Sequence, residues 1–371
     1  MTTALPDSLP QHMAAVLLKG HGGLDALDYR TDVAVPRPGP DEVLINVRAA
    51  GMNNTDINTR IGWYSKSVSD DTAEGGADGF DDVTTEDATW SGAPMEFPRI
   101  QGADVCGVIV EVGHDVDRSR IGERVLVRAM MRHPHDPTPF ACWTFGSEAD
   151  GGFAQFVTTS SFAAVAVNSS WSDVELASIP CAYSTAENML QRSNVGPEKV
   201  LITGASGGVG SAAVQLASRR GAHVIAMCSS SKAADVRALG ASDVIDRNAD
   251  LIATLGRNSV DVVVDLVAGP QWPNLLEVLR PGGRYVASGA IGGPITELDV
   301  RTLYLKDLSL FGATFQPDNV MTDLIGYIER DEIRPVVAGT YPLESIAEAQ
   351  TKFLSKTFTG KLVLVPPPLR Q

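Results

Sequence analysis

The chain has 371 residues, enough for two domains with separate hydrophobic cores, and its 44% hydrophobic and 20% charged residues are typical of a globular protein. A formal net charge of −15 disfavours nucleic acids and anionic membrane surfaces as general partners, because both would repel the chain. We see neither an apolar run that could span a membrane nor a signal-peptide pattern, and four cysteines without metal-site spacing suit reduced thiols. We therefore expect a cytoplasmic protein with a small-molecule substrate.

The first part of the chain, residues 13–167, consists of short β-branched segments separated by glycine and proline. Candidate strands are residues 14–19, 42–48, 107–112, 124–128 and 153–158. Several of them alternate apolar and polar residues. This pattern predicts an antiparallel, barrel-like domain rather than a unit of strand, helix and strand.

Residues 65–96 differ in composition from the rest of this part. The segment carries nine acidic residues against the single basic residue Lys66, with several glycines and few apolar anchors: Asp70, Asp71, Glu74, Asp78, Asp81, Asp82, Glu86, Asp87 and Glu96. Such composition is typical of a solvated, mobile surface insertion. Because the segment begins beside Trp63 and Tyr64, a lid over a substrate mouth is the alternative.

After residue 167 the pattern changes to strands that alternate with helices. Ser172 with Glu175, and Ser184 with Glu187, both fit the helix capping box and predict two helix starts. The candidate strands that follow are residues 199–203, 223–228, 244–245, 261–267, 283–288 and 307–314. This alternation predicts an α/β fold with a doubly wound parallel sheet.

The chain then divides into three segments. Residues 1–166 form the barrel-like domain with the acidic insertion 65–96, and residues 167–317 form the parallel-sheet domain. A helix at residues 319–329 precedes the mixed segment 334–365, so we expect residues 318–371 to rejoin the first domain.

A glycine-rich turn stands between a strand and a helix. Residues 199–204 are a β-branched apolar run, residues 211–220 have helical character, and Ser206, Gly207, Gly208, Val209 and Gly210 lie between them. Unpaired backbone N–H groups and the positive end of a helix dipole meet at such a turn, where a pyrophosphate can bind. The turn therefore predicts a dinucleotide cofactor.

The end of the second strand indicates which dinucleotide binds. NAD enzymes usually end this strand with Asp or Glu, whose carboxylate accepts hydrogen bonds from the ribose hydroxyls. Here Ser229, Ser230 and Lys232 follow Cys228, and Arg247 comes after the next apolar segment. Hydroxyls and cations without a local carboxylate favour a ribose phosphate, so we expect NADP(H).

Nearly the whole chain resembles the medium-chain dehydrogenase/reductase superfamily, and most closely its zinc-independent, quinone-oxidoreductase-like branch. The matching segments are GMNNTD at 51–56 with Arg60, Gly62 and Tyr64, PRIQGADVCG at 98–107, VG at 112–113, GERV at 122–125, CAYSTA at 181–186, the glycine turn, LGA at 239–241 and GKLV at 360–363. The resemblance implies a GroES-like β-barrel catalytic domain, a Rossmann cofactor domain and an active site between them.

The zinc alcohol dehydrogenases of this superfamily hold catalytic zinc at three positions, which the resemblance places at Asn53, Ala103 and Cys181. One thiol with an amide is a poor set of zinc ligands. In the lobe that corresponds to structural zinc, Cys142 stands alone near His133 and His135. We therefore expect no metal.

Without a Lewis acid, hydride addition to a conjugated acceptor is easier than reduction of an unactivated ketone. The resemblance suggests Asn53 and Tyr64 as hydrogen-bond donors, Thr185 as a hydroxyl on the nicotinamide face, and Asp56 with Arg60 from the same family segment. Alternatives stay open: Asp56 can pair with Arg60 at i, i+4 spacing, and Tyr64 can merely pack against Trp63. Cys181 fits a small buried apolar residue better than a nucleophile.

The rest of the cofactor pocket is expected where the parallel strands end. The resemblance places Val267, Ala290, Ile291, Thr314 and Lys361 around the cofactor. It also implies a homodimer in which the edge strands at residues 307–314 pair across a twofold axis.

These features predict an NADPH-dependent, zinc-independent reductase of a conjugated carbonyl compound or a quinone. An NADP-dependent alcohol dehydrogenase or carbonyl reductase of the same fold is one alternative. A non-catalytic NADPH-binding protein is another.

Overall fold

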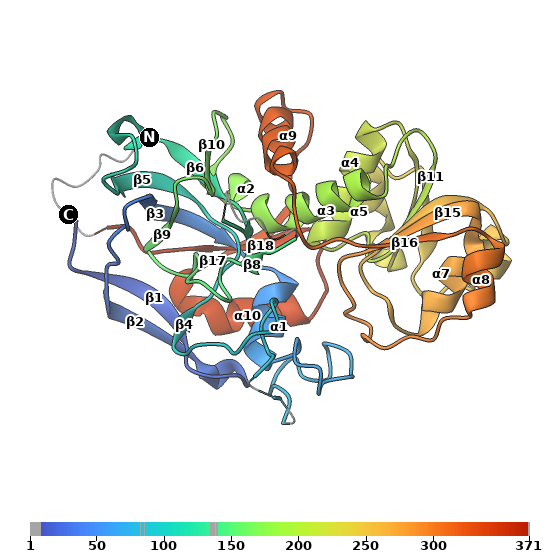
Figure 1. Ribbon diagram of the computed structural model, residues 1–371, viewed down its shortest axis with the longest axis horizontal. Helices are drawn as coiled ribbons and strands as arrows, with labels where there is room; N and C mark the ends of the chain where they lie inside the picture. The colour runs from blue at the N-terminus through green and yellow to red at the C-terminus, as the bar shows by residue number, and fades with distance from the viewer. Residues whose placement is uncertain (1–8, 82, 85, 134–137, 139, 370–371) are drawn as a thin grey trace.

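A computed structural model describes residues 9–369, with the exception of residues 82, 85, 134–137 and 139. Asp82 and His135, both named above, therefore lie outside the described residues. Figure 1 shows two lobes side by side: blue, green and red segments form one, and yellow and orange segments form the other. Helices of the middle of the chain connect them.

The first lobe is built on mixed and antiparallel sheets. The larger sheet has the strand order β10-β6-β5-β3-β18-β17, with β9 also paired to β3, and a smaller sheet has the order β2-β1-β4. A third sheet pairs β7 with β8. The strands of the first lobe are β1 (His12–Leu18), β2 (Leu27–Ala34), β3 (Glu42–Gly51), β4 (Arg99–Ile100), β5 (Cys106–Val112), β6 (Arg124–Val127), β7 (Met130–Met131), β8 (Trp143–Thr144), β9 (Phe156–Ser160), β10 (Ala164–Ala166), β17 (Val337–Pro342) and β18 (Lys361–Val365).

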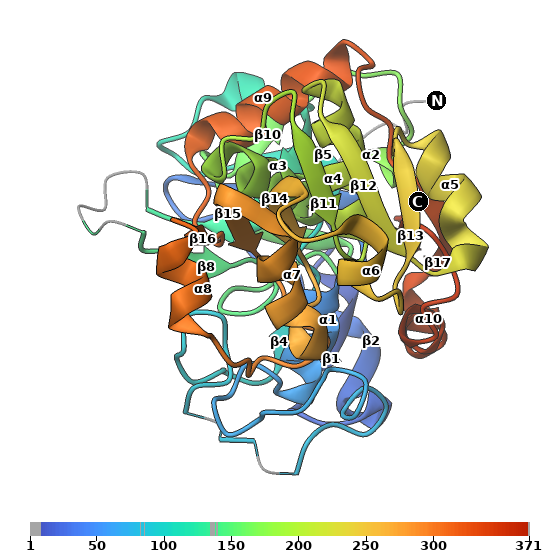
Figure 2. The same ribbon diagram turned by 90° about the vertical axis from the view of Figure 1, so that its right-hand side faces the viewer.

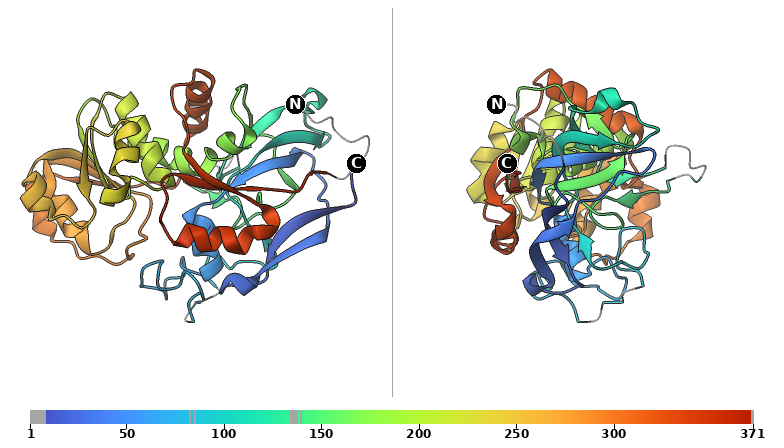
Figure 3. Two further views of the ribbon diagram at one scale, coloured as in Figure 1. Left: turned by 180° about the vertical axis from the view of Figure 1, so that it is seen from behind. Right: turned by 90° about the vertical axis from the view of Figure 1, so that its left-hand side faces the viewer.

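The end of the chain completes this first lobe. Val363 and Leu364 of β18 pair antiparallel with Gly51 and Ala50 of β3, and β17 runs parallel to β18. Figure 3 shows these red strands, with helix α10 (Ile346–Leu354), packed against segments from the beginning of the chain. The return of the chain places Lys361 beside the residues that follow β3.

The second lobe is a parallel sheet with strand order β13-β12-β11-β14-β15-β16 (Figure 2). Its strands are β11 (Lys199–Ile202), β12 (His223–Cys228), β13 (Asp243–Asp246), β14 (Val260–Asp265), β15 (Leu279–Ala287) and β16 (Ser309–Gly312). The order reverses at β11, and ligands bind outside the carboxyl ends of the strands at such a point. The predicted α/β fold with a doubly wound parallel sheet is confirmed.

Helices cover both faces of this sheet. Val200 and Ile202 of β11 pack in one cluster with helices α3 and α4, whereas Leu201 packs in another with helix α7. Burial on both faces explains why these strands are continuous apolar runs. The helices of the chain are α1 (Asn54–Ile61), α2 (Asp173–Leu176), α3 (Pro180–Arg192), α4 (Gly208–Arg219), α5 (Ala233–Ala238), α6 (Leu251–Leu255), α7 (Trp272–Val278), α8 (Val300–Leu305), α9 (Asp318–Glu329) and α10.

One predicted capping box is confirmed and the other is wrong. Ser172 and Glu175 form the box at the start of α2. Ser184 and Glu187, however, are buried inside α3, which begins at Pro180. Proline is favoured at the first helical position because its fixed φ suits a helix, so the helix begins one turn earlier than the Ser-Glu spacing indicated.

The acidic insertion 65–96 is tied to the first lobe by a buried arginine. Arg60 at the end of α1 has no exposed side-chain area, and its guanidinium donates to Gly22 O at 2.6 Å, Gly76 O at 2.7 Å and Gln350 Oε1 at 2.8 Å. Burial lowers its pKa to about 10. A buried guanidinium needs such acceptors, so it fixes one point of the insertion against the core.

Candidate active site

A narrow cavity lies where the two lobes meet. Its lining residues are Thr55, Trp90, Ala129, Met130, Thr144, Cys181, Thr185, Ser288, Ala313, Thr314 and Gln316. They come from α1, the insertion, the β7 and β8 region, α3 and the carboxyl ends of β15 and β16. Among these described lining residues none carries a formal charge. The predicted site residues Thr185 and Thr314 lie together here.

Thr55 lines this cavity and binds two of its neighbours. In the sequence it stands out only as part of the family segment GMNNTD. Its Oγ1 accepts a hydrogen bond from Trp90 Nε1 at 2.6 Å and another from the Tyr64 hydroxyl at 3.2 Å. A threonine oxygen has two acceptor positions and one hydrogen. With both acceptor positions in use, the Thr55 hydroxyl is directed to act as a donor toward a third group.

Tyr64 contacts the cavity through its neighbours. Its ring packs against Trp63 at 5.6 Å and against Trp90 at 5.1 Å between centroids. Burial raises the pKa of the Tyr64 hydroxyl well above its usual value, so the phenol stays protonated. The ring packs on Trp63, as the packing alternative expects, and the hydroxyl donates to Thr55; a direct donor role of Tyr64 toward substrate stays a prediction.

Beneath the cavity lies a group of buried charges, which we name the Lys361 cluster: Lys361, Asp104 and Asn53. Lys361 Nζ donates to Asn53 Oδ1 at 2.5 Å, Met52 O at 2.7 Å and Asp104 Oδ2 at 2.8 Å. The Lys361 side chain is 3% exposed and that of Asp104 is fully buried. Three acceptors satisfy the three N–H groups of the ammonium, which makes its burial tolerable.

Asn53 is committed to this cluster. Its Nδ2 donates to Asp104 Oδ2 at 2.9 Å and lies 3.4 Å from Gly51 O. The hydrogens of the predicted donor thus point at protein acceptors. Within this structure the amide positions the buried carboxylate and ammonium.

Asp56 stands beside the cluster at the start of α1. Its carboxylate accepts from Asn53 N at 2.7 Å and Ala103 N at 3.2 Å, which completes a capping box with Asn53. Burial and, to a smaller extent, the nearby Asp104 carboxylate raise the pKa of Asp56 to about 7. The alternative in which Asp56 pairs with Arg60 is wrong, because Arg60 points toward the insertion while Asp56 caps its own helix.

The three positions that hold zinc in related enzymes do not fit that metal here. Asn53 and Ala103 supply no strong zinc donor, and burial raises the pKa of the Cys181 thiol, which disfavours the thiolate that zinc requires. Cys181 N donates to Asp104 Oδ1 at 2.6 Å, while the Lys361 ammonium occupies the other oxygen. A divalent cation in this place would meet a buried positive charge. The described residues contain no cluster of three metal-ligating side chains, and His133 stacks on Trp143 instead.

The glycine turn fits a pyrophosphate. A Cβ on Gly210 would lie 2.1 Å from Gly204 O, so the turn needs glycine there to bring the start of α4 against β11. The first N–H groups of a helix have no acceptor within it, so they can point at an anion. Ser206 and Val209 belong to the same turn, and Ser206 O accepts from Gly360 N at 2.9 Å, which joins the turn to β18.

The stem of Lys361 also reaches this turn. Its Cδ lies 2.8 Å from the place where a Cβ on Gly208 would stand. A side chain at position 208 would therefore displace the lysine. The predicted cofactor residue Lys361 is thus beneath the turn with its ammonium in the buried cluster.

At the other end of the predicted cofactor site, β12 ends in hydroxyls. Ser229 Oγ lies 3.1 Å from Ser231 Oγ, and Lys232 Nζ donates to Lys356 O at 2.6 Å. Ser230 Oγ donates to Asp246 Oδ2 at 2.5 Å, and Arg247 follows directly. The fold therefore brings the Asp246 carboxylate among the hydroxyls and cations. The expectation of a site without a local carboxylate is wrong.

The remaining predicted cofactor residues lie at the carboxyl ends of β14 and β15. Val267 O accepts from Gly292 N at 2.8 Å, and Ala290 O accepts from Gly293 N at 3.0 Å. Ile291 O accepts from Thr72 N at 3.2 Å, which connects the insertion to the second lobe. The loops that follow β14 and β15 thus lie side by side at the carboxyl end of the sheet.

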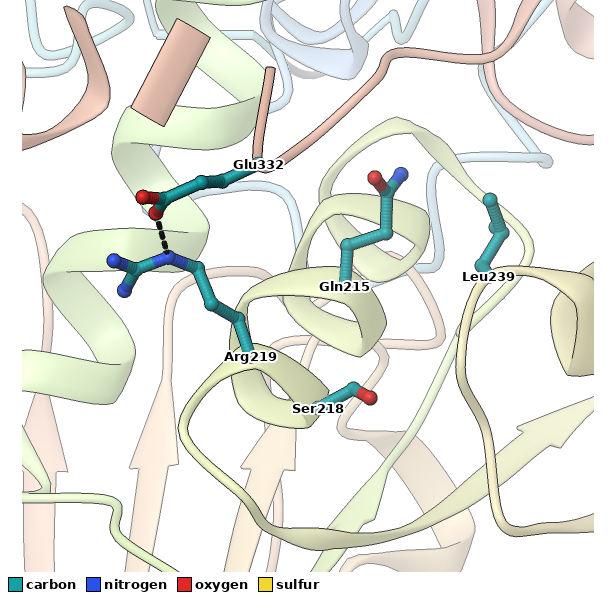
Figure 4. Close-up of a pocket in the computed structure, with 5 residues that line it drawn as sticks. All are labelled: Gln215, Ser218, Arg219, Leu239 and Glu332. Atoms are coloured by element: carbon teal, nitrogen blue, oxygen red, sulfur yellow. Dashed lines mark hydrogen bonds and ion pairs between the residues drawn. The ribbon is translucent and has the colours of Figure 1, made fainter. Parts of the chain in front are cut away.

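A separate hollow on the outer side of α4 is lined by Gln215, Ser218, Arg219, Leu239 and Glu332 (Figure 4). In it Arg219 and Glu332 point toward one another and form an ion pair at 2.5 Å. The two charges in this hollow therefore already neutralise each other. The hollow lies along the later turns of α4, away from the glycine turn at the beginning of that helix.

Among the described residues, no helix has the length and apolar character that crossing a membrane requires.

Two family models match the chain. Residues 39–169 match the alcohol dehydrogenase GroES-like domain, and residues 208–330 match the zinc-binding dehydrogenase. A crystal structure of an alcohol dehydrogenase candidate from Sinorhizobium meliloti 1021 is 44% identical, with a TM-score of 0.86, and the match covers 97% of this chain and 98% of that one.

Three curated relatives are each 28% identical. They are acryloyl-coenzyme A reductase of Metallosphaera sedula (95% of this chain, 99% of the relative), quinone oxidoreductase of Rattus norvegicus (95% and 98%) and NADPH-dependent alkenal/one oxidoreductase of Arabidopsis thaliana (97% and 81%). All three names are those of oxidoreductases.

The Asp56 carboxyl predicts a specific pH dependence of stability. Its pKa of about 7 in the fold lies above its ordinary value of 3.8, so the folded protein binds this proton more tightly than the unfolded chain. The contribution is therefore full below about pH 4 and is lost as the pH rises through 7, by up to roughly 4 kcal/mol. Asp56→Asn should flatten this decline. The measurement is the free energy of unfolding in urea between about pH 5 and about pH 8.

The exposed Asp41 offers a matched control. Asp41→Asn should keep the wild-type slope. An Asp56→Asn protein with an unchanged slope would show that the carboxyl is ionised throughout.

Proposed function

Because the chain belongs to the medium-chain dehydrogenase/reductase superfamily, in its quinone-oxidoreductase-like branch, we propose that this oxidoreductase uses NADPH to reduce a conjugated carbonyl compound or a quinone. The observation that carries the proposal is the uncharged cavity, into which Thr55 offers a hydroxyl whose acceptor positions are already used. Such a cavity suits a neutral acceptor that needs one hydrogen bond on its oxygen.

Thr55 is the residue that we assign to the substrate oxygen. When bound, the nicotinamide would supply a hydride to the β-carbon of the conjugated system, which leaves negative charge on the oxygen. A donor fixed in advance stabilises that charge without reorganisation. Tyr64 and Trp90 fix the Thr55 hydroxyl by donating to its oxygen.

The neighbouring threonines have a different proposed task. Thr185 on α3 and Thr314 after β16 line the cavity from the side of the second lobe. We assign both to the nicotinamide ring and its carboxamide, together with the backbone at Ala290 and Ile291. Asn53 and Asp56 position the start of α1, which carries Thr55.

The Lys361 cluster supports a reaction without zinc. Reduction of an unactivated ketone benefits from a Lewis acid that polarises its oxygen. Here the Lys361 ammonium lies against the Asp104 carboxylate, which also accepts from Cys181 N. A conjugated acceptor spreads the developing charge and needs only hydrogen bonds, so it suits these residues better.

The cofactor proposal rests on the residues after β12. Ser229, Ser230, Lys232 and Arg247 offer hydroxyls and cations to a ribose phosphate, whereas Asp246 opposes it. Partial burial lowers the pKa of Lys232, which weakens this support. The name of the Arabidopsis relative, NADPH-dependent alkenal/one oxidoreductase, is consistent with NADPH.

A homodimer and a cytoplasmic location are part of the proposal. The edge strand β16 and the segment before it expose apolar side chains, namely Ile295, Val300, Tyr304, Leu305 and Leu310. A bare edge strand with such neighbours is a surface that a second copy can cover. The cysteines Cys106, Cys142, Cys181 and Cys228 are free thiols, as a reducing compartment allows.

The direct test measures oxidation of NADPH and NADH by the purified protein with quinones, enones, enals and enoyl thioesters, alongside metal analysis. We expect NADPH-dependent turnover of at least one of these conjugated classes and no stoichiometric zinc. Oxidation of simple alcohols with bound zinc would favour the alcohol dehydrogenase that the S. meliloti relative suggests. Cofactor binding without any turnover would favour a non-catalytic protein.

Lys232 tests the cofactor preference. Lys232→Met should weaken NADPH binding about tenfold, as expected for loss of one charged hydrogen bond, and should leave NADH binding unchanged. Titration of protein fluorescence with each cofactor measures both constants. Lys19→Met, at an exposed position on the first lobe, is the matched control. An equal loss for both cofactors would place Lys232 away from the ribose phosphate.

Thr55 tests the assigned donor. Thr55→Val should lower kcat on the preferred acceptor by about 10² to 10³, the usual cost of losing one donor to a developing oxyanion, with unchanged NADPH affinity. Thr55→Ser keeps the hydroxyl and should retain most of the activity. Thermal unfolding shows whether the valine variant is folded, since it leaves two donors without their acceptor. A valine variant that is folded and fully active would refute the assignment.

A further inference from the structure

The acidic insertion 65–96 contacts both lobes. Arg60 binds Gly76 O from the first lobe, while Thr72 N donates to Ile291 O of the second lobe at 3.2 Å. In Figure 1 the insertion forms the light-blue loops below α1. Val68, Thr72, Ala88, Thr89 and Met95 within it are buried. The segment therefore bridges the two lobes and is packed at these positions.

Trp90 brings this insertion into the cavity itself. Its indole lines the cavity, donates to Thr55 Oγ1 at 2.6 Å and packs against the Tyr64 ring. It is the one aromatic residue among the described lining residues. A large planar side chain in this place limits the length of any molecule that reaches Thr55.

The backbone around Trp90 is held as firmly as its ring. Ser91 N donates to Glu148 Oε1 at 2.8 Å, and the other oxygen of that carboxylate accepts from Thr144 N at 2.8 Å. Thr144 lines the same cavity. On the other side, Thr89 Oγ1 donates to Ala93 O at 2.8 Å and closes the turn. Glu148 thus joins two walls of the cavity, and the backbone that carries Trp90 cannot move away without breaking these contacts, while the hydrogen bond to Thr55 holds the indole.

We propose that Trp90 is the end wall of the substrate cavity and restricts the enzyme to small, neutral conjugated carbonyl compounds. This inference rests on the proposed function and specifies its substrate class. Trp90 acts as a specificity-determining residue, because its ring fills the space that a longer alkyl chain would need. The uncharged lining gives no partner to a charged substrate group, whose burial would be costly.

The test compares kcat/KM for a series of unbranched vinyl ketones of increasing chain length, with NADPH. The wild type should prefer the shortest ketone over the eight-carbon one by at least about tenfold, the discrimination that a closed apolar pocket gives. Trp90→Ala should raise the relative kcat/KM for the eight-carbon ketone by at least about tenfold. Trp90→Leu, which keeps more packing, should give an intermediate profile and serves if the alanine variant does not fold.

Two further variants separate size from other effects. Trp90→Phe removes the indole N–H but keeps a large ring, so it should retain the preference for short ketones even if overall turnover falls. Trp63→Ala removes a neighbouring tryptophan that does not line the cavity, and it should leave the length profile unchanged. An opened profile in Trp63→Ala would mean that general loosening, not the wall, controls length.

The outcomes distinguish this inference from the proposed function. A wild type that reduces short and long ketones equally well overturns the inference and leaves the function intact, as does a Trp90→Ala profile identical to the wild type. A wild type that reduces none of the conjugated acceptors with either cofactor overturns both.

Discussion

The buried ammonium of Lys361 is the interaction on which the arrangement of this protein depends. It lies between Asp104 and Asn53, and a charge in that position is tolerable only while all its acceptors stay in place. Each partner belongs to a different segment: β18 carries the lysine, the segment before β5 carries Asp104, and the start of α1 carries Asn53. The same carboxylate accepts from Cys181 N at the start of α3. One satisfied ion pair thereby fixes the elements that surround the cavity.

Helix α1 transmits this constraint to the cavity. Its capping residues Asn53 and Asp56 join the buried cluster, its second residue is Thr55, and Arg60 at its end binds the insertion. A displacement of this short helix would therefore move Thr55, the proposed substrate donor, and would at the same time loosen the acidic insertion 65–96. This coupling gives Asn53 a structural role, because its amide holds the buried carboxylate and ammonium at the start of the helix that carries Thr55.

The sequence predicted much of the cofactor-binding lobe because its signals are local. The apolar strands, the glycine turn and the capping box at Ser172 depend on neighbours within a few residues, and the structure confirms each. The Ser184–Glu187 box failed although its spacing was correct, because Pro180 begins α3 one turn earlier. The alternative Asp56–Arg60 pair failed because each side chain has other partners. The Arg60 guanidinium donates to carbonyl oxygens that include Gly22 O, whereas the Asp56 carboxylate accepts from backbone N–H groups that include Ala103 N.

The sequence by itself determined the class of fold, the family and the position of the glycine turn, because hydrophobic periodicity and short motifs carry that information. Only the tertiary structure decided the contents of the site. Trp90 meets Thr55 across 35 positions, Ser230 meets Asp246 across 16, and Lys361 meets Asp104 across 257. No local pattern records such contacts, because they exist only where folding brings separate segments together and where burial forces each polar group to find a partner.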